Sequence, residues 1–160
     1  MEIRLAQTQD IPSILRLLAQ VGEVHHQIRP DIFPEGTIKY NAADLIALLK
    51  EADRPIFVAL EAEQVQGYCF CVVKHITAGT ASTCRRELYI DDLCVEESSR
   101  GTGVAQALYR HVCGYGKAEK CDFVTLNVWQ GNERAMAFYQ KCGLRPRNIM
   151  MEIPLEDNLC

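Results

Sequence analysis

The chain has 160 residues, of which 48% are hydrophobic and 24% charged, and its formal net charge is −4. This length suits one domain with a single core, and this hydrophobic content argues against intrinsic disorder. The negative charge argues against a general nucleic-acid binder, and no apolar run approaches the roughly 20 residues of a membrane span. We therefore expect one domain over residues 1–160, in the cytoplasm, without nucleic-acid or membrane partners.

Apolar periodicity predicts a first half with a strand, two helices and a second strand. The expected elements are a strand over 2–6, a helix from Asp10 to about Val21, a polar connector over 22–37, a helix over 41–51 and a strand over 56–60. Asp10 can cap the first helix, with Pro12 in its first turn. Pro55 ends the second helix.

The second half reads as paired strands followed by a strand between two helices. The expected elements are strands over 64–75 and 86–95, a helix after Gly103, a strand over 122–128, a helix after Asn132 and a last strand over 148–153. The strands near 88–95 and 122–128 are joined by a helix and should be parallel. The sequence thus predicts an α/β fold with a mixed, mostly antiparallel sheet flanked by helices.

The eight cysteines favour reduced thiols over a disulfide framework or a metal site. Disulfide frameworks belong to short secreted chains with poor cores, and most of these cysteines lie in apolar strands or on helices, where Cys behaves as a small hydrophobe. Cys69-x-Cys71 lacks a second Cys pair or a nearby His pair, so we expect no zinc.

The strand at 86–95 changes phase at its two acidic residues. Leu88 and Ile90 share one face, but the apolar positions resume at Leu93 and Val95, one residue out of step. A β-bulge at Asp91–Asp92 would restore the phase, and bulges commonly redirect groups beside active sites. The alternative is a strand that merely ends in an acidic turn.

A glycine-containing loop follows this strand and opens a helix, within the stretch IDDLCVEESSRGTGVAQALYRHV at 90–112. Free N–H groups and the helix dipole make such a helix start a site for phosphate or pyrophosphate. A P-loop would need Lys-Ser/Thr after Gly103, and a dinucleotide fingerprint would need a small residue in place of Gln106. Neither of these motifs fits.

The pattern Arg-x-x-Gly-x-Ala at Arg100, Gly103 and Ala105 resembles the acetyl-CoA loop of the GCN5-related N-acetyltransferase (GNAT) superfamily. Downstream, LNVWQGNERAMAFYQKCGL at 126–144 resembles the family's later pattern of strand, Asn, helix and aromatic-Tyr. Leu144 stands where the family usually has an aromatic. Together the two motifs identify the chain as resembling a bacterial, small-molecule type of GNAT protein.

The resemblance implies a single GNAT domain whose central strands splay around acetyl-CoA, the acetyl donor, with no metal. It also implies the strand bulge already inferred. In the family, strand backbone groups pair with pantetheine and the loop wraps the pyrophosphate. The corresponding cofactor-binding residues here are Leu93, Cys94, Val95, Arg100, Gly101, Thr102, Gly103, Val104, Ala105, Asn132 and Tyr139.

Acetyl transfer to an amine requires a base, an oxyanion donor and a proton for the departing thiolate. The catalytic candidates are Asp91 or Asp92 as base, directly or through water, and Tyr139 as general acid. Asp91 is slightly favoured over Asp92, because it matches the carboxylate proposed as base in relatives that acetylate polyamines. The N–H of Leu93 or Cys94 could face the thioester oxygen. The resemblance implies direct transfer, so Cys94 is not expected to be a nucleophile. Either carboxylate could instead satisfy backbone groups at the bulge.

The resemblance implies an N-acetyltransferase acting on a primary amine of a small molecule, such as a polyamine, an amino acid or an aminoglycoside. A protein-amine acetyltransferase and a non-catalytic acyl-CoA sensor are the alternatives. The connector could supply the acceptor pocket through His25, His26, Asp31, Phe33 and Glu35. Solvated loop positions are the favoured interpretation for the two histidines, and Phe33 could instead belong to the core. The apolar strand over 148–153 predicts a homodimer in which this region takes part. The alternative is an internal strand of the sheet in a monomer.

Overall fold

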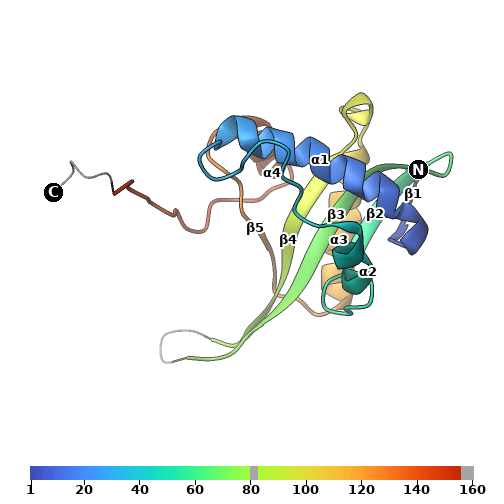
Figure 1. Cartoon of the computed structure of the whole chain (residues 1–160). Helices are drawn as coiled ribbons and strands as arrows, with labels where there is room; N and C mark the ends of the chain where they lie inside the picture. Colours follow the sequence, from blue (N-terminus) through green and yellow to red (C-terminus); the bar gives the residue numbers. More distant parts are fainter. Residues whose placement is uncertain (80–82, 156–160) are drawn as a thin grey trace.

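The computed structural model describes residues 1–79 and 83–155, which form one α/β domain around a five-stranded sheet (Figure 1). The sheet order is β1-β2-β3-β4-β5. The strands are β1 (Glu2–Leu5), β2 (Ile56–Glu61), β3 (Gln64–Ile76), β4 (Arg85–Val95) and β5 (Phe123–Leu126). The first four strands pair antiparallel, whereas β4 and β5 are parallel. The predicted mixed, mostly antiparallel sheet is confirmed.

Helices cover both faces of this sheet. They are α1 (Ile11–Ile28), α2 (Ala42–Leu48), α3 (Val104–Ala118) and α4 (Glu133–Lys141), with short 3-10 turns η1 (Thr8–Asp10) and η2 (Glu97–Ser99). In Figure 1, α1 and α2 lie in front of the sheet and α3 lies behind it. Buried side chains form one cluster between the sheet and α1–α2 and another between the sheet and α3. None of the helices in the described residues is both long and apolar enough to cross a bilayer.

Helix ends follow the signals in the sequence. The side chain of Asn41 accepts a hydrogen bond from the Asp44 N–H at 3.0 Å and caps α2. Asn132 Oδ1 caps α4 by accepting from the Ala135 N–H at 3.1 Å. Gly143 follows α4 with a φ of 93°, which suits glycine at this position, and the Leu144 N–H returns to the Tyr139 carbonyl at 3.0 Å. These caps fix where α4, and Tyr139 on it, lies.

The first helix is longer than predicted. It continues to Ile28 and includes His25 and His26, where the sequence suggested a polar connector starting at Gly22. The glycine serves a close backbone approach rather than a break: a Cβ there would lie 2.4 Å from the Thr37 carbonyl oxygen. The returning connector therefore packs directly on the helix.

The last predicted strand is wrong. Residues 148–155 are extended but pair with no strand in the described part of the chain. Figure 1 shows this segment leaving the body of the molecule. The prediction rested on the apolar, Met-rich composition of residues 148–153, but a strand also needs hydrogen-bond partners for its backbone, and this segment has none among the described strands.

Candidate active site

The predicted bulge in β4 is confirmed and lies at the acidic pair. Phe70 of β3 pairs with Asp92, whereas Cys71 pairs with Ile90, so Asp91 is the extra residue on β4. Cross-strand partners share a face, and Phe70 belongs to the cluster beneath α1. The bulge therefore places the Asp92 carboxylate on the α1 side of the sheet.

Beside this bulge the sheet is open. The pairing of β4 with β5 runs only from Glu87 to Ile90, so residues 91–95 have no strand on that side within the described chain. The Glu96 N–H donates to the Gln66 carbonyl at 2.8 Å. Antiparallel alternation then turns the N–H of Cys94 toward β3 and that of Leu93 into the opening. Of the two expected oxyanion donors, the geometry favours Leu93.

Asp92 has the surroundings of a general base. Tyr68 Oη donates a 2.8 Å hydrogen bond to Asp92 Oδ2. Desolvation raises the pKa of Asp92 to about 6, although the Tyr68 bond and the charge of Lys39 both lower it. A carboxyl with this pKa is mostly ionised at neutral pH and still basic enough to take a proton.

Asp91 is engaged differently. Its Oδ2 accepts hydrogen bonds from Lys39 Nζ at 2.7 Å and from Tyr40 Oη at 3.2 Å. Tyr40 also stacks on Phe70 at 5.6 Å between ring centroids, which holds the connector over the bulge. Asp91 thus anchors the connector through an ion pair, whereas no salt bridge among the described residues holds Asp92. The geometry therefore favours Asp92, and not the expected Asp91, as the candidate base.

Tyr139 of α4 is buried, with 9% of its surface exposed. Burial, followed by the neighbouring acidic groups of Cys69 and Asp92, raises the pKa of Tyr139 well above its usual value. The phenol therefore keeps its proton at physiological pH.

The loop before α3 has the backbone of an anion site. Gly101 and Gly103 have φ values of 80° and 96°, a left-handed conformation that favours glycine. A Cβ at either position would meet no atom within 4 Å, so the space in front of the loop is open. Thr102 Oγ1 donates to the Ser99 carbonyl at 2.7 Å and fixes the turn. The first N–H groups of α3 have no intrahelical partner.

The other predicted cofactor-binding residues lie partly in the loop and partly in the core. Arg100 Nη1 donates to Glu97 Oε1 at 3.2 Å, and Val104 is buried against the sheet. Asn132 uses its side-chain oxygen as the α4 cap, which leaves its amide NH₂ for another contact. The bulge, the loop and the start of α4 together fit a ligand with a phosphate-bearing end and an extended arm.

The surroundings of Cys94 do not favour a nucleophilic thiolate. Its thiol is buried, accepts a hydrogen bond from Gln20 Nε2 at 3.2 Å and donates to the Leu17 carbonyl at 3.5 Å. Desolvation, with Asp92 adding to it, raises the pKa of Cys94 to about 12. Hardly any thiolate is present at neutral pH.

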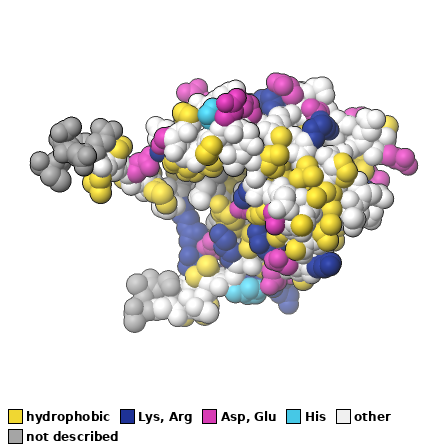
Figure 2. All heavy atoms as spheres, in the orientation of Figure 1, with side chains coloured by type: hydrophobic (Ala, Val, Ile, Leu, Met, Phe, Trp, Pro, Cys, Tyr) yellow, Lys and Arg dark blue, Asp and Glu magenta, His cyan; other side chains and the backbone are white. Residues whose placement is uncertain are grey.

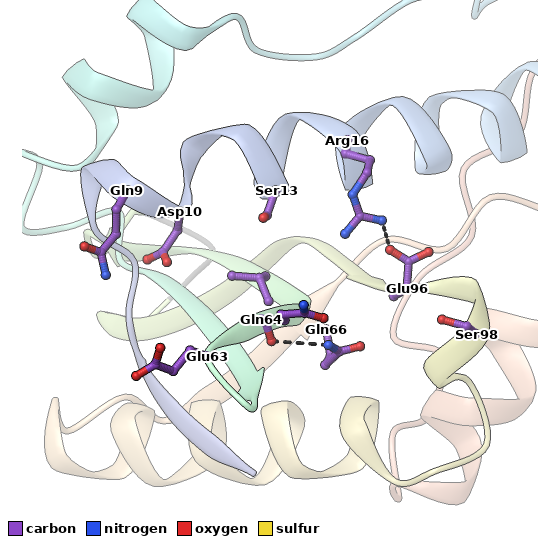
Figure 3. Close-up of a pocket in the computed structure, with 10 residues that line it drawn as sticks. Gln9, Asp10, Ser13, Arg16, Glu63, Gln64, Gln66, Glu96 and Ser98 are labelled. Atoms are coloured by element: carbon purple, nitrogen blue, oxygen red, sulfur yellow. Dashed lines mark hydrogen bonds and ion pairs between the residues drawn. The ribbon is translucent and has the colours of Figure 1, made fainter.

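A separate polar hollow of about 540 Å³ lies where the start of α1 faces the β2–β3 turn (Figure 3). Figure 3 shows Arg16 of α1 reaching across to Glu96. None of the predicted catalytic or cofactor-binding residues lines this hollow, which Asp10, Ser13 and Gln66 also border. It is therefore not part of the candidate active site.

The sequence pattern of the acetyltransferase (GNAT) family matches residues 21–144. The chain belongs to the GNAT family. It is 31% identical over 67 residues to a glucosamine 6-phosphate N-acetyltransferase of Trypanosoma brucei brucei, an alignment that spans 42% of this chain and 44% of that enzyme.

Solved structures extend the likeness over the whole GNAT domain. A point mutant of the BH1408 protein from Bacillus halodurans is 32% identical, with a TM-score of 0.93 over 98% of this chain and 100% of that one. The aminoglycoside N-acetyltransferase AAC(6')-Iy, solved with CoA, is 16% identical, with a TM-score of 0.72 over 96% and 93%. The latter likeness shows the shared fold alone.

The connector residues that were expected to line an acceptor pocket contact Trp129, which the sequence did not single out. The Phe33 ring packs on His25 and, edge-on, on Trp129, with ring centroids 5.0 and 5.2 Å apart. Burial, followed by the charge of Lys39, lowers the pKa of His25. Asp31 is bound by Arg29 at 2.6 Å and is therefore not a free carboxylate. Phe33 and Tyr40 are thus half-buried points of contact on a connector whose residues 30–32 and 34–39 are exposed.

The sequence analysis did not identify three contacts around the candidate site, because each of them joins residues that are far apart in the chain. Tyr68 faces Asp92 across the sheet, Lys39 binds Asp91 from the connector, and Trp129 meets Phe33 from the β5–α4 loop. The sequence offered a partial signal only for Tyr68, since a polar hydroxyl inside an apolar strand needs a partner. Glu35, another expected acceptor residue, is exposed on the connector.

Proposed function

We propose that this protein is an acetyl-CoA-dependent N-acetyltransferase that acts on the primary amine of a small molecule. One observation carries the proposal: the β4 bulge sets the Asp92 carboxylate, with a pKa of about 6, beside the stretch of β4 that β5 leaves unpaired. Tyr139, the expected general acid, is buried and keeps its proton. An amine acetyltransferase needs a base and an acid of this kind. The glycine loop before α3 supports a donor that carries phosphate groups.

Acetyl-CoA would supply an acetyl group activated as a thioester. On the donor side, the N–H groups of residues 101–105 would bind the pyrophosphate, and the Leu93 N–H would stabilise the oxyanion. The side-chain NH₂ of Asn132 adds a polar contact. Every one of these groups belongs to a strand end or a helix start, so little reorganisation is needed on binding.

The proton transfers follow from the two side chains. Asp92, directly or through one water, takes the proton that the acceptor amine loses as its nitrogen bonds to the acetyl carbon. Tyr139 gives its proton to the sulfur as the carbon–sulfur bond breaks. The phenolate is then reprotonated from solvent, and the carboxylate releases its proton, which restores both groups.

The acceptor side favours an amine without a second positive charge. A polyamine would need a free carboxylate for its distant ammonium group. Of the carboxylates on and beneath the connector, Asp91 is held by Lys39 and Asp31 by Arg29, and Glu35 lies on the exposed side. An amino sugar or an amino acid suits these surroundings better. The name of the trypanosomal relative, a glucosamine 6-phosphate N-acetyltransferase, points in the same direction.

Reduced thiols fit a cytoplasmic setting, since all seven described cysteines are free.

A mass-spectrometric screen tests the proposal. The protein and acetyl-CoA are incubated with glucosamine 6-phosphate, an aminoglycoside, a set of amino acids, spermidine and a peptide with a free N-terminus. We expect a gain of one acetyl group on an amino sugar or amino acid and little on spermidine. Acetylation of the peptide alone would favour a protein-amine acetyltransferase. Acetyl-CoA binding without acetylation of any amine would favour the sensor alternative.

A further inference from the structure

Positive side chains gather on part of the sheet face that carries Asp92. This surface, here called the basic patch, consists of Lys74, Arg85, Tyr89, Asn127 and Arg147. Lys74 lies four residues along β3 from Phe70, the cross-strand partner of Asp92, so Lys74 and Asp92 point to the same side of the sheet. Figure 2 shows Lys and Arg atoms gathered between residues 148–155 and the β3–β4 hairpin. The patch and the candidate base therefore share one face.

The patch carries positive charge that the described residues do not neutralise. Glu87 is only 6% exposed and accepts hydrogen bonds from Arg85 at 2.6 Å and from Arg147 at 2.7 Å. One carboxylate thus holds two guanidinium groups, which leaves one positive charge in excess. Lys74 forms no salt bridge with any described residue, and its Nζ lies 3.4 Å from the centroid of the Tyr89 ring. In a chain with a net charge of −4, such a concentration of positive charge favours an anionic ligand.

Hydrogen-bond donors in the patch match an anion as well. Asn127 Nδ2 donates to Tyr89 Oη at 3.1 Å, so the phenol keeps its own proton for another acceptor. The side chain of Arg147 is 53% exposed, and only one of its N–H groups is needed for Glu87. Phosphate and carboxylate oxygens accept hydrogen bonds and bind best to charged donors. The patch therefore offers the donors that a phosphate or carboxylate group requires.

The basic patch and the glycine loop lie on opposite sides of Asp92. Strand β4 begins at Arg85, within the patch, and ends at Val95, from which the chain continues to the loop. The donor's pyrophosphate at the loop would therefore leave the patch unoccupied. An anion in the patch has to come from another molecule, and the acceptor is the one that must approach Asp92.

Strand geometry sets the length of such an acceptor. Tyr89 pairs with Val72, two residues from Phe70 on β3, and Lys74 is four residues from Phe70. At about 3.3 Å per residue, these positions lie roughly 7–13 Å from Asp92 along the strand. An α-amino acid is too short, because a single carbon separates its amine from its carboxylate. A phosphorylated amino sugar, or an amino acid whose reacting amine is at the far end of its chain, spans this distance.

We propose that the basic patch binds an anionic group of the acceptor, and that the acceptor is an amine with a phosphate or carboxylate at its far end. The inference rests on the proposed N-acetyltransferase function and narrows its acceptor class. Lys74, Arg147 and the Tyr89 hydroxyl hold the anion. The amine at the other end then reaches Asp92, so that binding at the patch orients the nucleophile.

Matched pairs of acceptors test the charge requirement. Glucosamine 6-phosphate is compared with glucosamine, and 6-aminohexanoate with hexylamine, as kcat/KM for acetylation. We expect the anionic member of at least one pair to be better by about tenfold or more, the effect of one hydrogen bond between charged groups. A preference in the first pair would identify phosphate as the bound anion, and one in the second pair carboxylate. Equal kcat/KM within both pairs would overturn the proposal.

Substitution of Lys74 locates the preference in the patch. Lys74→Gln removes the charge but keeps most of the side chain, and should raise the KM of the anionic acceptor about tenfold. Lys74→Arg keeps the charge and should retain most of the preference. Lys117→Gln is the matched control, because Lys117 is an exposed lysine on α3, behind the sheet. A preference that Lys74→Gln leaves intact would overturn the assignment to the patch.

A binding measurement separates this inference from the proposed function. Calorimetry of the protein saturated with CoA, titrated with glucosamine 6-phosphate or 6-aminohexanoate, measures recognition of the anion without turnover. Binding that Lys74→Gln weakens about tenfold would support the patch even if no amine were acetylated, a result that would overturn the proposed function alone. Binding of neither compound, or binding that Lys74→Gln leaves unchanged, would overturn this inference alone. Circular dichroism confirms that each variant is folded.

Discussion

The hydroxyl of Tyr68 and the carboxylate of Asp92 are joined by a 2.8 Å hydrogen bond across β3 and β4. Burial raises the pKa of Tyr68 well above its usual value, so this residue stays a donor at any physiological pH. It orients the carboxylate without neutralising it. Because desolvation outweighs this bond, the pKa of Asp92 rises to about 6, within reach of neutral pH.

The decrease of kcat/KM on the acidic side of its pH profile, here called the acid limb, should follow the protonation of Asp92. Since the reaction needs the carboxylate, kcat/KM should fall about tenfold per pH unit below pH 6 and level off above it. Asp92→Asn should lower kcat/KM by roughly 10²–10⁴-fold and abolish this limb. Asp91→Asn is the control and should keep the limb. If Asp92→Asn retained a full acid limb, the base would be another group.

Lys39 should influence the pH at which the acid limb occurs. Its positive charge lowers the pKa of Asp92, so Lys39→Gln removes a stabiliser of the carboxylate and should move the limb to higher pH. Lys39→Arg retains the charge and should leave the limb nearly in place. The measurement is kcat/KM against pH with a saturating acetyl donor. A downward shift in Lys39→Gln would contradict the electrostatic argument.

Tyr139→Phe keeps the ring and its packing against Phe138 but removes the hydroxyl. Acetyl-CoA affinity, measured by calorimetry, should change little, whereas kcat should fall by roughly 10²–10⁴-fold if the phenol protonates the departing thiolate. Tyr109→Phe removes a hydroxyl from the same aromatic group and should retain activity. Equal turnover of the two variants would assign Tyr139 a structural role.

Gly103→Glu should abolish acetyl-CoA binding and leave the protein folded. The new side chain would sit at a φ of 96° and direct a carboxylate into the space in front of the loop, where it would repel pyrophosphate. Gly114→Glu adds the same charge on the same helix, also in open space, and should bind normally. Calorimetry with CoA and thermal unfolding of both variants provide the comparison. Normal binding by Gly103→Glu would place the phosphates elsewhere.

The sequence was sufficient for features that depend on local pattern. The phase change between Ile90 and Leu93 predicted the bulge, because side chains alternate along a strand with a period of two. Asn132 and Gly143 predicted the ends of α4 because capping is a local hydrogen-bonding requirement. These positions fix where Asp92 and Tyr139 lie, so the location of both candidate residues in the fold could be predicted.

The parts that the sequence missed depend on distant contacts. Gly22 reads as a helix break in sequence, but its lack of a Cβ lets Thr37 approach the helix. Lys39 reads as a solvated charge, and only the path of the connector brings it to Asp91. The strand pattern at 148–153 gave no information about whether a pairing edge lies within reach in the same copy.

Cys94→Ala should separate direct transfer from an acetylated-cysteine intermediate. The thiol is buried with a pKa of about 12, so we expect the variant to retain turnover and to lose only about 1 kcal/mol of stability from the vacated space. Gln20 would lose its sulfur acceptor but keep its 3.0 Å bond to the Val95 carbonyl. Intact-protein mass spectrometry of the wild type with acetyl-CoA should find no acetyl group on Cys94. An acetylated Cys94, together with an inactive Cys94→Ala, would replace direct transfer by a two-step route.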